Sequence, residues 1–248
     1  MNTVAASGNP ALNEKVFRKY AVGADREVMT VGGTVNKTFL LFLLLIASAA
    51  WVWNRFVTTG GGTGLMWVGF IGGFILAMIT AFKVEWSPYT APVYAVFEGL
   101  ALGGLSAFFE AMYPGIVMKA VALTFGVFFM MLFLYRSQII KPTQRFTMGV
   151  VAATGGIALV YLVSWIASLF GASLGFLNSG SGLSIGLSLF IVGIAALNLV
   201  LDFAFIDRAS AAGAPKFMEW YGGFGLMVTL VWLYIEILRL LANLANRQ

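Results

Sequence analysis

Two residue types that carry much of enzyme chemistry are missing from this chain of 248 residues. It has no cysteine, which excludes disulfides, thiolate metal sites and cysteine nucleophiles. It has no histidine either, which excludes a Ser-His dyad, an HExxH zinc site and a histidine pH sensor. Any proton chemistry must use Asp, Glu, Lys, Arg or Tyr side chains, and we expect no enzyme.

Charged residues are also scarce. They make up 10% of the chain, whereas 60% of it is apolar, and the mean hydropathy is +0.91. Soluble proteins are about 25% charged and need that polar shell. The composition therefore predicts an integral membrane protein whose main surroundings are the lipid bilayer. We assign the net charge of +5 to loop residues that set topology, and expect no nucleic-acid partner.

Seven apolar runs follow a polar amino-terminal stretch. Residues 1–37 are predicted to form a cytoplasmic tail with a short helix at 13–20, and residues 38–244 a membrane domain. Each run approaches the roughly 20 residues that a helix needs to cross the hydrocarbon core. The fold class predicted is an all-α bundle of seven transmembrane helices, with spans at about 38–57, 65–82, 89–109, 117–135, 148–170, 183–206 and 220–241.

The distribution of basic residues predicts the orientation. With seven spans, eleven of the fifteen lysines and arginines fall on the side of the amino terminus. Basic loops stay in the cytoplasm, so we expect the amino terminus inside and the carboxyl terminus outside, in a bacterial inner membrane. A six-span alternative, in which one run does not cross, places both ends on one side.

Four polar residues lie well inside the predicted spans. Glu98 is near the middle of the third, Asn198 and Asp202 lie one turn apart in the sixth, and Thr229 is near the middle of the seventh. A charge at the centre of a membrane helix costs about 2.5–3.5 kcal/mol, so such residues usually face a bundle interior or a cavity. We expect these four to form a polar path from mid-membrane to the cytoplasmic face.

Structural roles are the alternative for each residue. Glu98 could be neutral and cross-link helices, and Asp202 could cap a helix end. Thr229 could bond its own backbone. Glu236 precedes Arg239 by three positions, a spacing that allows a local ion pair, and both are secondary candidates.

Other charged residues, Glu110, Lys119, Asp207 and Glu219, lie at span ends, where solvation is expected. Glycines at small-xxx-small spacing predict close helix packing in three places, at Gly69/Gly73, Gly99/Gly103 and Gly182/Gly186.

Three motifs in order resemble the Bax inhibitor-1/YccA family of Bax-inhibitor-motif membrane proteins. Residues 97–103, Phe-Glu-Gly-Leu-Ala-Leu-Gly, look like its Glu-Gly-Leu-x-Leu-Gly signature. Leu201-Asp202, followed by Ile206, resembles its Tyr-Asp-Thr-Gln-x-Ile, and residues 226–241 resemble its last helix. The resemblance implies a seven-helix fold in which the last helix is central.

The resemblance also implies function. Some members are similar to pH-sensitive calcium leak channels, and Asp202 matches one aspartate of their pH-sensing pair. Thr229 stands where many members have the second aspartate, so a basic residue such as Lys83 is a candidate partner for Asp202. We therefore expect a calcium or other cation leak gated by protonation. The alternative is a regulator that binds a membrane-bound protease or a stress-response partner. We expect no cofactor other than calcium as the transported ion, and assign no metal ligands.

Overall fold

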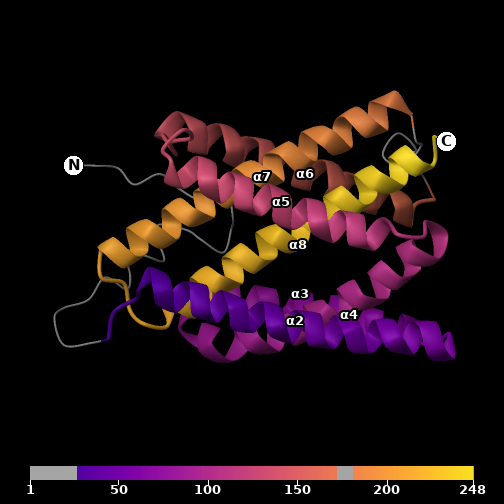
Figure 1. Cartoon of the computed structure of the whole chain (residues 1–248), viewed down its shortest axis with the longest axis horizontal. Coiled ribbons are helices and arrows are strands. Elements are labelled where there is room, and N and C mark those ends of the chain that lie inside the picture. The colour runs from indigo at the N-terminus through magenta and orange to yellow at the C-terminus, as the bar shows by residue number, and fades with distance from the viewer. Residues whose placement is uncertain (1–26, 172–180, 248) are drawn as a thin grey trace. The chain divides into compact units, whose positions relative to one another are not determined.

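The computed structural model describes residues 27–171 and 181–247, and the short helix expected at 13–20 lies outside them. Those residues form seven long helices, all long and apolar enough to cross a membrane (Figure 1). The helices are α2 (Val31–Thr59), α3 (Thr63–Phe82), α4 (Ser87–Met112), α5 (Ile116–Arg136), α6 (Gln144–Leu169), α7 (Gly182–Ala211) and α8 (Met218–Ala245). The all-helical seven-span prediction is confirmed.

Each helix begins before the apolar run that predicted it. α2 begins at Val31, so residues 31–37 of the predicted polar tail are helical. Thr30 caps this helix, because its hydroxyl accepts a 2.9 Å hydrogen bond from the backbone N–H of Gly33. The other end of α2 stops at Gly60, whose φ of 62° is a left-handed conformation that glycine adopts without strain.

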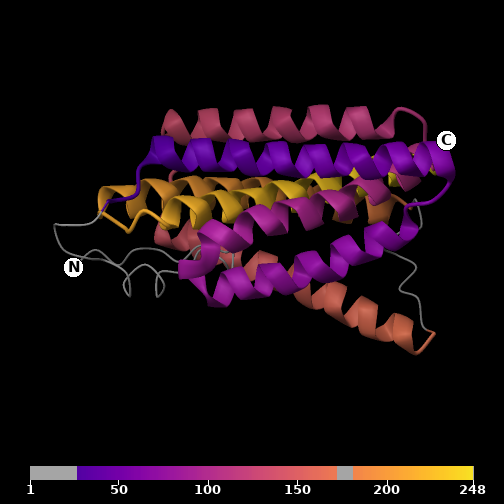
Figure 2. The same cartoon turned by 90° about the horizontal axis from the view of Figure 1, so that it is seen from below.

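The described residues fall into two compact units. The amino-terminal unit contains residues 27–114 and 204–228, and the carboxyl-terminal unit contains residues 115–171, 181–203 and 229–247. α7 and α8 each run without a break and contribute residues to both units (Figure 2). The expected orientation, and the expected central place of the last helix, stay predictions.

In the amino-terminal unit, α4 packs along α2 and α3. Glycines make this possible, as their spacing predicted for two of the three pairs. A side chain at Gly103 would come 2.4 Å from the carbonyl oxygen of Ala49 in α2, and one at Gly69 would come 2.4 Å from the backbone of Ala101 in α4. The third pair, Gly182/Gly186, differs, because no atom of another described element lies within 4 Å of where their side chains would begin.

Candidate functional site

Asp202 lies fully buried in α7 of the carboxyl-terminal unit. Asn198 is buried four residues earlier on the same helix face. Its side-chain amide donates a 2.8 Å hydrogen bond to the hydroxyl of Thr154 in α6 and a 2.9 Å hydrogen bond to the carbonyl of Ile194. Asn198 thus joins two helices by a polar contact one turn away from the buried carboxylate. Thr229, in α8 of this unit, is buried as well.

Aromatic rings surround the next position of α7. Phe203 makes an edge contact with Phe128 at 5.7 Å between ring centroids, and its ring lies 5.8 Å from that of Tyr135, both in α5. The family signature has threonine at this position, so an apolar aromatic contact follows Asp202 here. Aromatic side chains of α5 therefore pack against α7 at the residue that follows Asp202.

Glu98 and Lys83 belong to the amino-terminal unit. Glu98 is partly buried in α4, and a side-chain hydrogen bond joins it to Tyr94 one turn earlier. Its Oε2 atom lies only 3.2 Å from where a side chain at Gly73 of α3 would begin, so the carboxylate packs against a bare helix backbone. Lys83 is exposed after the end of α3. The polar path from Glu98 to Asp202, and the pairing of Lys83 with Asp202, stay predictions.

Glu236 and Arg239 are brought together as their spacing predicted. Their side chains form an ion pair with 3.5 Å between the guanidinium Nη1 and Oε2 of the carboxylate. Two further side chains contact Glu236. The hydroxyl of Tyr161 in α6 donates a 2.7 Å hydrogen bond to Oε1, and the indole N–H of Trp232 donates a 3.2 Å hydrogen bond to the same atom. Arg239 also donates to the Tyr161 hydroxyl and lies over its ring.

This cluster explains how Glu236, which is only 1% exposed, is tolerated inside the bundle. A buried charge is stable when it is paired and its lone pairs accept hydrogen bonds. The spacing of Glu236 and Arg239 predicted their ion pair, but nothing in the sequence indicated that Tyr161, 75 positions earlier, completes it.

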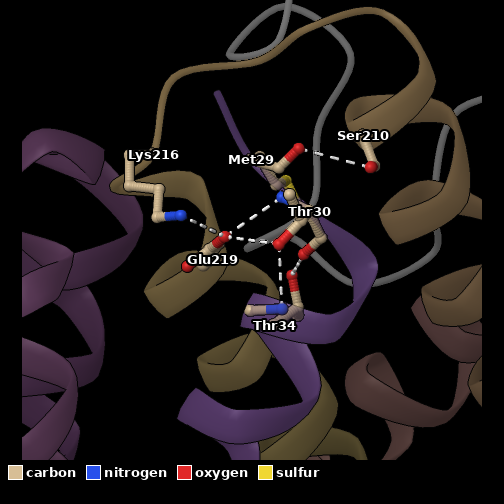
Figure 3. Close-up of polar contacts among 7 residues, drawn as sticks. Met29, Thr30, Thr34, Ser210, Lys216 and Glu219 are labelled. Atoms are coloured by element: carbon tan, nitrogen blue, oxygen red, sulfur yellow. Dashed lines mark hydrogen bonds and ion pairs between the residues drawn. The ribbon is translucent and has the colours of Figure 1, made fainter. Parts of the chain in front are cut away.

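The expectation for Glu219 is wrong. Its place at a span end indicated a solvated side chain, but it is 1% exposed. Oε1 accepts 3.0 Å hydrogen bonds from the backbone N–H and from the hydroxyl of Thr30, at the start of α2 (Figure 3). Lys216, 3.3 Å away, is the one sequence signal, because it stands three positions before Glu219.

Acidic side chains elsewhere do not gather into a metal site. Within residues 27–171 and 181–247, no three acidic residues lie close enough together to hold an ion. Asp202, Glu219 and Glu236 are therefore buried without forming such a cluster.

Seven apolar helices with buried carboxylates define a multi-pass integral membrane protein. The chain belongs to the Bax inhibitor 1 like family, whose model matches residues 9–246. That family is generally not enzymatic. No curated protein and no solved structure matches the chain.

Proposed function

We propose that the protein is a cation leak channel, calcium being the favoured ion, and that protonation of its buried carboxylates controls the flux. The observation that carries the proposal is Asp202, a carboxylate with no exposed surface inside a helix that contains an 18-residue stretch of mean hydropathy 2.4. Acidic residues inside membrane spans are costly and mark ion or proton pathways. Membership of the Bax inhibitor 1 like family supports it, because the resemblance seen in the sequence implies that some members are similar to pH-sensitive calcium leak channels.

The chemistry of the neighbouring groups fits a hard cation. Calcium prefers oxygen ligands from carboxylates, amides and carbonyls. Asp202, Asn198 and Thr229 are buried oxygen-bearing side chains of one unit, and they come from two helices. Proton uptake by a carboxylate removes the charge that attracts the ion, so the leak depends on pH.

Calcium-dye flux into proteoliposomes tests the proposal. We expect faster calcium entry than into protein-free liposomes, with rates that differ between a mildly acidic and a mildly alkaline medium. Asp202→Asn and Glu98→Gln keep the size of each side chain and remove its charge, and each should change the flux. Glu85→Gln is the matched control, because Glu85 is exposed between α3 and α4.

Two results would contradict the leak. One is calcium entry no faster than into protein-free liposomes at either pH. The other is identical flux by wild type, Asp202→Asn and Glu98→Gln under all conditions. The first result favours a protein that binds a membrane-bound partner without transport, and the second removes the role of the two carboxylates in any flux that is observed.

A further inference from the structure

The chain just before α2 is attached to the loop between α7 and α8. The backbone N–H of Met29 donates a 2.7 Å hydrogen bond to the carbonyl of Ala214, and the N–H of Lys216 donates a 3.0 Å hydrogen bond to the carbonyl of Glu27. Val28 and Pro215 thereby form an isolated antiparallel bridge. Ser210, near the end of α7, donates 3.3 Å to the carbonyl of Met29 (Figure 3). All these residues belong to the amino-terminal unit.

Glu219 is the buried charge beside this attachment. It lies in the first turn of α8 and accepts hydrogen bonds from Thr30, so its carboxylate stands at the amino-terminal ends of both α8 and α2. Helix amino termini stabilise negative charge. Gly33 leaves the space that the carboxylate needs, because a side chain there would come 2.0 Å from Oε1 of Glu219.

Capping of α2 does not require Glu219. The Thr30 hydroxyl already accepts from the N–H of Gly33, which is the usual way a helix start is satisfied. The hydrogen bonds that Thr30 donates to Glu219 therefore have a different effect, because they link residues 189 positions apart. We call the contacts of Glu219 with Thr30 and Lys216, together with the Val28–Pro215 bridge, the Glu219 clamp.

Two buried groups hold segment 27–30 in place, the side chain of Met29 and the carboxylate of Glu219, each 1% exposed. The other contacts are open to water, because Val28 and Thr30 are exposed and Lys216 is 47% exposed. Glu219 supplies the charge-assisted hydrogen bonds of the clamp, which are stronger than bonds between neutral groups. Loss of its charge therefore weakens the polar part of the attachment and leaves Met29 as the buried apolar contact, so local opening becomes easier.

We propose that the Glu219 clamp opens and closes, and that the closed clamp restrains the leak. The second part, the restraint of the leak by the closed clamp, rests on the proposed function. Glu219 begins the helix that carries Thr229 ten positions later, so fixing the first turn of α8 to the start of α2 limits how that helix moves. Release of the clamp frees α8 and increases conduction.

Thiol labelling in detergent tests the opening, and the absence of native cysteine makes one introduced thiol the only target. Ala214→Cys places it at a position 1% exposed within the clamp, and Ala95→Cys places it at a fully buried site in α4. Adding Glu219→Gln should raise the rate of maleimide labelling at position 214 about tenfold, as loss of a charge-assisted bond predicts. Glu85→Gln should leave that rate unchanged.

Two labelling results would overturn the clamp. Equal rates at position 214 with and without Glu219→Gln mean that Glu219 does not hold the segment. Equally faster labelling at position 95 means that Glu219 supports the whole unit rather than a local contact.

A reversible disulfide tests the regulation. Val28 and Pro215 face each other as a non-hydrogen-bonded antiparallel pair, whose short Cα separation suits a disulfide. The oxidised Val28→Cys/Pro215→Cys protein should pass less calcium into proteoliposomes than the same protein after reduction, and each single variant should not respond to reduction.

The outcomes separate the two proposals. If the wild type leaks but oxidation of the pair changes nothing, the clamp does not regulate and the leak stands. If the wild type does not leak, the proposed function fails and with it the regulation, whereas labelling at position 214 still decides whether the clamp opens.

Discussion

The hydroxyl of Tyr161 in α6 donates a 2.7 Å hydrogen bond to the carboxylate of Glu236 in α8. The same hydroxyl accepts from Arg239, so one oxygen bridges both members of the ion pair. Both hydrogen bonds join α6 to α8 within the carboxyl-terminal unit. Removing this one oxygen atom therefore removes both of them.

We predict that Tyr161→Phe destabilises the protein by about 1–2 kcal/mol. Hydrogen bonds between membrane helices contribute about 0.6–1.7 kcal/mol, and a charged partner raises the cost of losing one. Thermal unfolding in detergent, followed by tryptophan fluorescence, measures the change. Tyr89→Phe is the control, since Tyr89 is 79% exposed and its hydroxyl can be solvated. Equal melting temperatures for both variants would refute the role of this hydroxyl.

Gly33→Ala should disturb the site of Glu219. The added methyl group would lie 2.0 Å from Oε1, so either the carboxylate or the start of α2 must move. Such overpacking costs about 1–3 kcal/mol. The adjacent Gly32→Ala is a matched control, because outside its own helix no atom of the described residues lies within 4 Å of the added methyl group. The melting temperature should fall for Gly33→Ala only, and a similar fall for both would show that glycine itself, not the space, matters there.

Gly103→Ala should loosen the packing of α4 on α2. Its methyl group would come 2.4 Å from the backbone carbonyl of Ala49, which cannot rotate away as a side chain can. We expect a lower melting temperature and faster proteolysis than for Gly64→Ala in α3, where the space is open. If both substitutions leave stability unchanged, the two helices do not depend on this close approach.

The sequence predicts most of this fold because the bilayer restricts the secondary structure that a spanning segment can adopt. Apolar runs of about 20 residues must be helices, so seven runs gave seven helices. Helix ends were less predictable, since hydropathy marks the membrane core and not the capping residue. α2 therefore begins at Val31, where Thr30 supplies a cap, rather than at the first apolar run.

The polar contacts were predictable only where they are local. The three-residue spacing of Glu236 and Arg239 indicated their ion pair. The four-residue spacing of Asn198 and Asp202 placed both on one face of α7, where both are buried. The partners of Glu219 and Glu236 lie 189 and 75 positions away, and no periodicity in a single sequence reveals such pairs. Glu219 was therefore expected to be solvated, whereas Thr30 donates hydrogen bonds to it and Gly33 leaves the space that it occupies.

The pH dependence of calcium flux by Asp202→Asn decides whether this buried carboxylate controls the leak. Asparagine fills the same space but cannot take up a proton, so we expect a flux that differs from wild type and varies less between mildly acidic and mildly alkaline media. Glu85→Gln, measured in parallel, should retain the full pH response. A wild-type pH response in Asp202→Asn would contradict control of the leak by this buried carboxylate.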